Sequence, residues 1–154
     1  MTRVLFVCVK NGGKSQMAAG LFRHAVADGP DRGRWQVESA GTKAGTKLNG
    51  LSVESLAEVG VDISGEQPRQ LTPELQRGAD VVVTVGEADV DPLPGPTYET
   101  WQIDEPSLRG INGPERMCLV RDDIARHVED LHRRLTGSRT MASTADPGEE
   151  RRGG

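Results

Sequence analysis

The chain has 154 residues, a formal net charge of -4 and 35% apolar residues. This length and apolar content fit one domain with a single core, and the acidic balance argues against a protein that binds nucleic acid or anionic lipid through bulk charge. No apolar run approaches the roughly 18 residues that a membrane-spanning helix needs. The two cysteines are too few for a disulfide framework and the N-terminal apolar run is too short for a signal peptide, so we expect a protein of the reducing cytoplasm.

Short apolar runs alternate along the chain with segments of helical periodicity. The first run, Arg3 to Val7, is rich in β-branched and aromatic residues, as is typical of a strand buried on both faces. Residues 15–27 then place apolar side chains at helical spacing, and Gly29 and Pro30 end the pattern. The same signals predict further strands at residues 35–40, 80–85 and 97–101, and further helices at residues 51–59, from Thr72 onward, and at residues 115–135.

The alternation of strands and helices predicts a doubly wound α/β fold, with a four-stranded parallel sheet and helices on both faces. Ligands of such sheets bind at the carboxyl ends of the strands, where the loop after the first strand emerges. Residues 1–136 are expected to form the domain. Residues 137–154 lack apolar periodicity and are predicted to be a disordered tail.

The segment CVKNGGKS at residues 8–15 lies between the first strand and the first helix. It matches a nucleotide-binding P-loop except that Cys8 replaces the leading glycine. Two adjacent glycines allow backbone N–H groups to converge on one oxyanion, and the helix that follows adds its positive dipole end. The predicted oxyanion-binding residues are those of the loop, namely Val9, Lys10, Asn11, Gly12, Gly13, Lys14 and Ser15.

The same positive field acts on the sulfur of Cys8. A helix N-terminus and a nearby cation favour the thiolate, which is the nucleophilic form of cysteine. Lys14 supplies the cation, and the Ser15 hydroxyl can donate a hydrogen bond to the sulfur. The loop is therefore predicted to hold a tetrahedral oxyanion and to present a nucleophile to its central atom. An NTPase is the least supported alternative, because its chemistry has no use for the Cys8 sulfur. An NTPase also needs a carboxylate after a strand to bind magnesium, and Asp80 begins its strand instead of following it.

Several segments resemble the low-molecular-weight tyrosine phosphatase family, whose signature after the first strand is a cysteine, five residues, then arginine and serine. The resemblance begins with VLFVCVKNGGKSQMA at residues 4–18 and continues with VESAGT at residues 37–42 and RDDI at residues 121–124. It covers about residues 3–136. It implies the fold predicted above and a catalytic role for Cys8, Lys14 and Ser15.

Two departures from the phosphatase pattern point to another substrate. Lys14 stands where the phosphatases carry an arginine, whose guanidinium holds two oxygens of a phosphoryl group at once. The paired tyrosines of many phosphatases are missing, since Pro106 is followed by Ser107 and Leu108. The chain is most similar to arsenate-reducing relatives, in particular to a branch that keeps lysine in the loop and couples arsenate to the thiol mycothiol. The resemblance thus implies arsenate as substrate, with phosphate or sulfate as mimics.

The resemblance also bears on the source of electrons. The thioredoxin-coupled relatives need two further cysteines near the middle of the chain, and residues 78–100 contain none. Cys118 lies beside the apolar stripe of the predicted last helix and is interpreted as structural. We therefore expect a small thiol co-substrate, mycothiol, and a glutaredoxin-like mycoredoxin as partner. No tightly bound cofactor is expected, and no metal, because the three histidines lack ligand spacing.

The family's general acid is an aspartate that precedes a proline after the fourth strand. Aligning Trp101 with the family's tryptophan places Glu105 at this position, with Asp104 beside it, and both stay candidates. Cys8 is compatible with two roles, a covalent adduct with arsenic or orientation of the incoming thiol. A phosphotyrosine phosphatase of reduced efficiency and an oxyanion-binding module without turnover remain as alternative functions.

Overall fold

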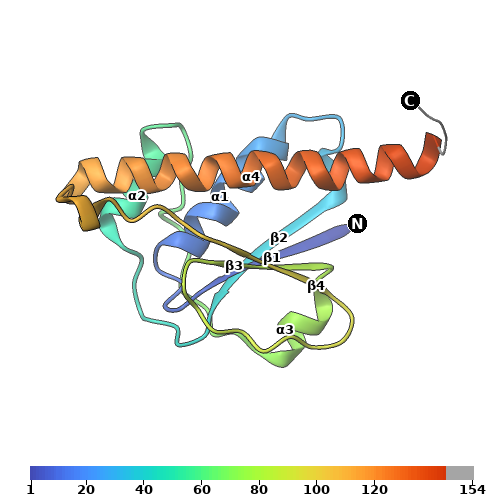
Figure 1. The fold of residues 1–154 in the computed structure, drawn as a ribbon, viewed down its shortest axis with the longest axis horizontal. Helices are drawn as coiled ribbons and strands as arrows, with labels where there is room; N and C mark the ends of the chain where they lie inside the picture. The colour runs from blue at the N-terminus through green and yellow to red at the C-terminus, as the bar shows by residue number, and fades with distance from the viewer. Residues whose placement is uncertain (145–154) are drawn as a thin grey trace.

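The computed structural model describes residues 1–144, with side chains through residue 137. Its centre is a sheet of four strands, β1 (Thr2–Cys8), β2 (Trp35–Gly41), β3 (Val81–Val85) and β4 (Thr97–Trp101), in the order β2-β1-β3-β4 (Figure 1). All three neighbouring pairs are parallel. The four-stranded parallel sheet predicted from the sequence is confirmed.

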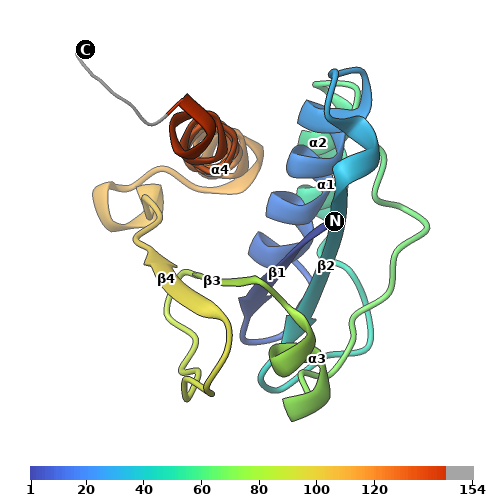
Figure 2. The same cartoon turned by 90° about the vertical axis from the view of Figure 1, so that its right-hand side faces the viewer.

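Helices cover both faces of this sheet. The described helices are α1 (Lys14–Ala27), α2 (Gly50–Ala57), α3 (Pro73–Gly78) and α4 (Gly113–Thr144), with short 3-10 turns η1 (Arg32–Arg34) and η2 (Pro106–Arg109). Figure 2 shows α1, α2 and α4 together on one side of the sheet and α3 on the other. None of the helices within residues 1–144 has both the length and the apolar content needed to cross a bilayer.

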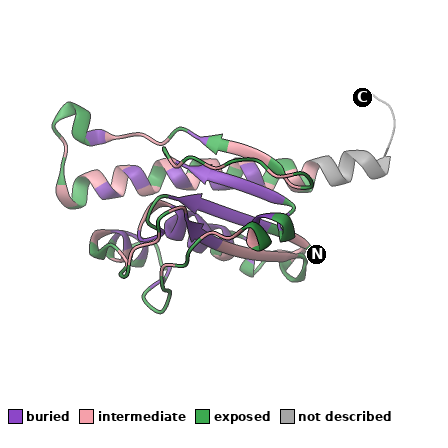
Figure 3. Cartoon of the chain, turned by 90° about the horizontal axis from the view of Figure 1, so that it is seen from below, coloured by how far each residue is buried: buried purple, intermediate pink, exposed green. Residues whose placement is uncertain are grey.

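The main core lies between the sheet and the three helices α1, α2 and α4. The two central strands, β1 and β3, are buried on both faces (Figure 3), which explains their continuous apolar sequence. Phe6 lies at the centre of this core, with its ring 5.9 Å from that of Phe22 and 5.5 Å from that of Trp101. A smaller apolar cluster, which includes Leu5, Val7 and Val82, fills the α3 side.

Helix α4 extends beyond its predicted end at residue 135. The structure continues it through Gly137 to Thr144, so residues 137–144 of the predicted tail are helical. One glycine inside a helix costs only about 1 kcal/mol, and no proline follows until Pro147. Residues 145–154, the rest of the predicted tail, lie outside the described residues.

Candidate active site

The loop between β1 and α1, residues 8–15, is called the oxyanion loop below. Cys8 ends β1, and its Sγ lies 2.9 Å from the hydroxyl oxygen of Ser15. The backbone N–H of Asn11 donates to the same sulfur at 3.3 Å. The structure therefore brings Cys8 and Ser15 together as the sequence indicated, and the Ser15 hydroxyl and the Asn11 N–H both lie within hydrogen-bonding distance of the sulfur.

Asn11 holds the oxyanion loop in shape from the inside. It is fully buried and has a φ of 57°, a left-handed conformation that asparagine tolerates better than most residues. Its amide nitrogen donates to Ser15 Oγ at 2.7 Å. Its Oδ1 accepts from Gln16 Nε2 at 3.1 Å and from the backbone N–H of Arg69 at 2.8 Å. One side chain thus ties the loop to α1 and to a segment 58 positions away.

Residues 42–49, called the flanking segment below, run alongside the oxyanion loop. Their N–H groups donate at 2.7 to 3.0 Å to four loop carbonyls, those of Cys8, Val9, Lys10 and Gly12. Gly12 permits this approach, because an added Cβ would lie 2.8 Å from the carbonyl oxygen of Lys47. Within the described residues, the N–H groups of Lys10, Gly12 and Gly13 donate to no acceptor. The loop therefore keeps donors available for an anion.

Lys14 extends toward the carboxyl end of the neighbouring strand β3. A Cβ added at Gly86 would lie 3.4 Å from Lys14 Cδ and 3.6 Å from its Nζ, and Gly86 has a φ of 90°. The bare backbone of Gly86 thus leaves room for the lysine side chain. Lys14 and Cys8 both line one open cleft.

This cleft has a volume of about 930 Å³, at the upper end of the range for small-molecule sites. The oxyanion loop and the flanking segment form one wall, and Val85, Glu87 and Glu105 contribute to the rest. Met117 and Val120 of α4 add apolar surface. A tetrahedral oxyanion of a few non-hydrogen atoms occupies a small part of this space, so the cleft has room for a second reactant.

The two candidate acids differ in position. Glu105 lines the cleft, whereas Asp104 does not. Arg116 of α4 binds the Glu105 carboxylate through two hydrogen bonds of 2.6 and 2.7 Å. Arg109 binds Asp104 in the same way, at 2.8 and 2.9 Å. The geometry agrees with the register argument for Glu105, while both side chains are already engaged by an arginine.

These arginines also fix the charge of the two carboxyls. The Arg116 guanidinium, assisted by the Ser107 hydroxyl, holds the pKa of Glu105 far below its ordinary value of 4.5. The hydrogen bonds from Arg109 lower the pKa of Asp104. Both groups are carboxylates at neutral pH in this arrangement. Glu105 can therefore deliver a proton only after its pair with Arg116 opens.

Replacing Arg116 with leucine is expected to destabilise the protein at pH 7 and to change its acid response. Because the folded-state pKa of Glu105 is depressed, the pair contributes stability above the ordinary value of 4.5, and this contribution is lost as pH falls. The difference in unfolding free energy between wild type and Arg116→Leu should therefore shrink between pH 7 and about pH 3. Urea denaturation at pH 7, 5 and 3 measures it.

A matched control is Arg77→Leu, which removes the partner of Glu74 in an exposed pair at 3.5 Å. Such exposed pairs contribute little, so its effect should be small at every pH. An Arg116→Leu difference that stays constant from pH 7 to pH 3 would contradict the assignment of the pair.

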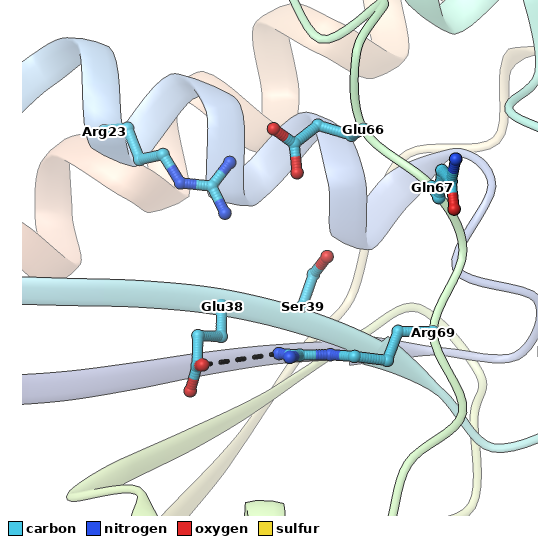
Figure 4. A pocket seen from close by; sticks show the side chains of 6 residues that line it. All are labelled: Arg23, Glu38, Ser39, Glu66, Gln67 and Arg69. Carbon is cyan, nitrogen blue, oxygen red and sulfur yellow. Dashed lines mark ion pairs between the residues drawn. The ribbon is translucent and has the colours of Figure 1, made fainter.

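A smaller hollow of about 240 Å³ lies beside the oxyanion loop. Its lining residues are Arg23, Glu38, Ser39, Glu66, Gln67 and Arg69 (Figure 4). Arg69 pairs with Glu38 of β2 at 3.5 Å, and the carbonyl oxygen of Gln67 accepts from Gln16 Nε2 at 3.1 Å. These contacts anchor the segment that carries the Arg69 N–H, so they support the loop through Asn11.

Cys118 lies on α4 facing the end of α2. Its thiol donates to Glu58 Oε1 at 3.4 Å, and Arg121 lies 3.7 Å from the sulfur. Burial, with the hydrogen bond to Glu58, raises the pKa of the Cys118 thiol. A thiol held in this form is a weak nucleophile, in agreement with a structural role. Among the described residues, no group of three His, Cys, Asp or Glu side chains gathers as a metal site.

Sequence reasoning missed several residues that build this site. They are Gln16, Gly86, Arg116 and the two segments at residues 42–49 and 67–69. A glycine directly after a buried strand is a local signal that could have pointed to Gly86. The others act through contacts between distant parts of the chain, for which a single sequence gives no periodic signal.

Known proteins resemble this chain in sequence. Residues 3–140 match the family described as low molecular weight phosphotyrosine protein phosphatase. The chain is 34% identical over 134 residues to an arsenate reductase of Shouchella clausii, an alignment that covers 82% of this chain and 91% of that protein.

Solved structures give the same result. A thioredoxin-dependent arsenate reductase of Corynebacterium glutamicum has a TM-score of 0.72 and 32% identity, over 90% of this chain and 63% of the other, so this chain spans less than two thirds of that protein. An arsenate reductase in the phosphate binding state has a TM-score of 0.68 and 28% identity, over 85% and 96%. By sequence, sheet and cysteine loop together, the chain belongs to the low molecular weight phosphotyrosine protein phosphatase family, as an enzyme of its arsenate reductase branch.

Proposed function

We propose that the protein reduces arsenate with electrons from a small thiol, mycothiol. The observation that carries this proposal is the oxyanion loop, where the Cys8 sulfur, available backbone N–H groups and the Lys14 side chain border the same cleft. Arsenate reductases among the relatives, one of them solved with phosphate bound, support a tetrahedral oxyanion as the ligand. The volume of the cleft supports a thiol as second reactant.

The reaction proposed here has two steps. Arsenate sits in the loop with its charge balanced by Lys14 and the N–H groups, and a sulfur displaces one oxygen, which leaves as water. This sulfur belongs either to Cys8 or to the thiol that Cys8 orients. A second thiol then attacks the bound sulfur, a disulfide forms, and the As–S electron pair stays on arsenic, which is released as arsenite. A mycoredoxin-like protein is the proposed partner for this second step.

A proton must reach the departing oxygen in the first step. Of the two candidate acids only Glu105 lines the cleft, and we assign this role to it ahead of Asp104, which pairs with Arg109 and is not among the lining residues. Arsenate is an anion that can compete with Glu105 for Arg116, and opening of this pair would return the pKa of Glu105 toward its ordinary value. Binding of the substrate would then prepare the acid.

The choice of a small thiol over thioredoxin rests on the cysteines. Residues 78–100 contain none, and Gly86 occupies the position directly after β3. Cys118 is engaged by Glu58 and Arg121 on the last helix. The Corynebacterium protein depends on thioredoxin by its description, which makes thioredoxin the direct competitor.

The test is arsenite formation by the purified protein with arsenate and one reductant at a time, with a mycoredoxin-like protein in every assay to supply the second thiol. Mycothiol, glutathione and reduced thioredoxin are compared at equal thiol concentration. We expect arsenite with mycothiol and none with thioredoxin. Turnover with thioredoxin alone would overturn the small-thiol assignment, and absence of arsenite with every reductant would overturn arsenate reduction.

A second candidate function is hydrolysis of phosphate monoesters, which the family match favours. Lys14→Arg is expected to raise hydrolysis of an aryl phosphate by about tenfold, because a guanidinium binds two phosphoryl oxygens at once. The same change is expected to lower arsenite formation. Initial rates of aryl phosphate hydrolysis and of arsenite formation, measured for wild type and Lys14→Arg, test both changes. A wild-type aryl phosphatase that Lys14→Arg does not improve would contradict this account of lysine.

A further inference from the structure

All four lysines of this chain line the same cleft. They are Lys10 and Lys14 of the oxyanion loop and Lys43 and Lys47 of the flanking segment. Everywhere else along the chain, the permanently charged basic residue is arginine. The described arginine ion pairs lie mainly along α4, for example Arg126 with Asp123 and Arg133 with Asp130. Arg116 also lines the cleft, but its charge is paired with Glu105.

Backbone contacts fix the outer lysines at the mouth of the cleft. The N–H of Lys43 donates to the carbonyl of Val9 at 2.8 Å, and the N–H of Gly45 donates to the carbonyl of Lys10 at 2.9 Å. Lys10, Lys43 and Lys47 are exposed, and we call them the lysine rim. Their position therefore follows from the hydrogen bonds that also shape the oxyanion loop.

The lysine rim carries uncompensated charge. Within the described part of the chain, none of the four lysines makes an ion pair or a side-chain hydrogen bond. Of the two carboxylates that line the cleft, Glu105 is already neutralised by Arg116, and Glu87 is left against four ammonium groups. The cleft is therefore positive, although the whole chain carries a formal charge of -4.

We propose that the lysine rim draws anions into the cleft and sets the preference of the Cys8 site for anionic over neutral reactants. This inference rests on the proposed function in that its natural ligand is the arsenate dianion. Clefts lined by charge of one sign raise the local concentration and the association rate of an oppositely charged ligand about tenfold or more. A dianion gains twice as much from each lysine as a monoanion does.

The test compares two alkylating reagents of similar size that react with the same thiolate. Iodoacetate carries one negative charge and iodoacetamide carries none, so the ratio of their rates at Cys8 reports the potential there. Peptide mass spectrometry separates Cys8 from Cys118. At low ionic strength, the Lys43→Gln, Lys47→Gln double variant is expected to lower the ratio about fivefold. A change in the thiolate fraction affects both reagents equally and cancels.

Two controls define the result. The Arg77→Gln, Arg133→Gln double variant removes the same charge from distant exposed positions and is expected to keep the wild-type ratio. The Lys43→Arg, Lys47→Arg double variant keeps the charge and should also keep the ratio. In 1 M salt, where the Debye length is about 3 Å, wild type and the glutamine variant should converge.

The proposal is overturned if Lys43→Gln, Lys47→Gln leaves the ratio unchanged, or if the distant arginine variant lowers it equally. The readout needs no arsenate turnover. A protein that makes no arsenite but shows the expected ratios would contradict the proposed function and support the lysine-rim proposal. A protein that makes arsenite but keeps the wild-type ratio in the Lys43→Gln, Lys47→Gln variant would support the proposed function and overturn the lysine-rim proposal.

Discussion

Cys8→Ser is expected to lower thiol-dependent arsenite formation by about 10⁴-fold or more, because a serine hydroxyl stays protonated and is a far weaker nucleophile than a thiolate. Serine is smaller than cysteine and can keep the contacts to Ser15 and to the Asn11 N–H. The anion cradle should therefore survive. The measurement is the initial rate of arsenite release with mycothiol and a mycoredoxin-like protein at saturating arsenate.

Cys118→Ser is the matched control for this prediction. Cys118 contacts Glu58 and Arg121 and is not part of the cleft lining, so its replacement should leave the rate within about twofold. Phosphate binding by Cys8→Ser shows that the loop is still folded. A Cys8→Ser protein that keeps a tenth of the wild-type rate, or a Cys118→Ser protein that loses most of it, would contradict the assignment of the nucleophile.

Asn11→Ala is expected to reduce the free energy of unfolding by about 3 kcal/mol, the largest stability effect predicted for the site. The substitution leaves the amide of Gln16 and the N–H of Arg69 with one acceptor fewer, and Ser15 loses a donor. It also places alanine at a φ of 57°, which costs about 1 kcal/mol or more. Arsenite formation should fall with it, since the loop loses its internal support.

Asn11→Gly separates the two causes. Glycine adopts a left-handed conformation without a steric penalty but makes none of the side-chain hydrogen bonds. Its unfolding free energy should lie about 1 kcal/mol above that of Asn11→Ala and below that of wild type. Urea denaturation of wild type, Asn11→Gly and Asn11→Ala measures the three unfolding free energies and hence their order. An Asn11→Ala loss under 1 kcal/mol, or no difference between alanine and glycine, would contradict the role of Asn11.

The fold could be predicted because its signals are local. The central strands β1 and β3 are buried on both faces and are nearly continuous apolar runs, while α1 follows β1 with helical spacing. The order Gly13, Lys14, Ser15 after a strand places the loop at a strand-to-helix junction without any tertiary information. Cys8, Lys14 and Ser15 were found for this reason.

The rest of the site depends on contacts between distant segments. From the sequence, Asn11 is one of the predicted oxyanion-binding residues, and its link to a distant segment becomes visible only when the N–H of Arg69, 58 positions away, reaches its Oδ1. Glu105 could be placed by register, but its pairing with Arg116 requires α4 to be docked. The C-terminal end of α4 was not predicted, because the helix propensity of the residues after Gly137 neither clearly favours nor clearly opposes a helix.

The central claim is that the oxyanion loop binds arsenate above the sulfur of Cys8. The most direct measurement is a crystal structure of the Cys8→Ser protein grown with arsenate. We predict arsenic density in the loop, with its oxygens within hydrogen-bonding distance of the N–H groups of Lys10, Gly12 and Gly13 and near Lys14 Nζ. Arsenate bound only at the lysine rim, or a loop that stays empty at saturating arsenate, would contradict the account.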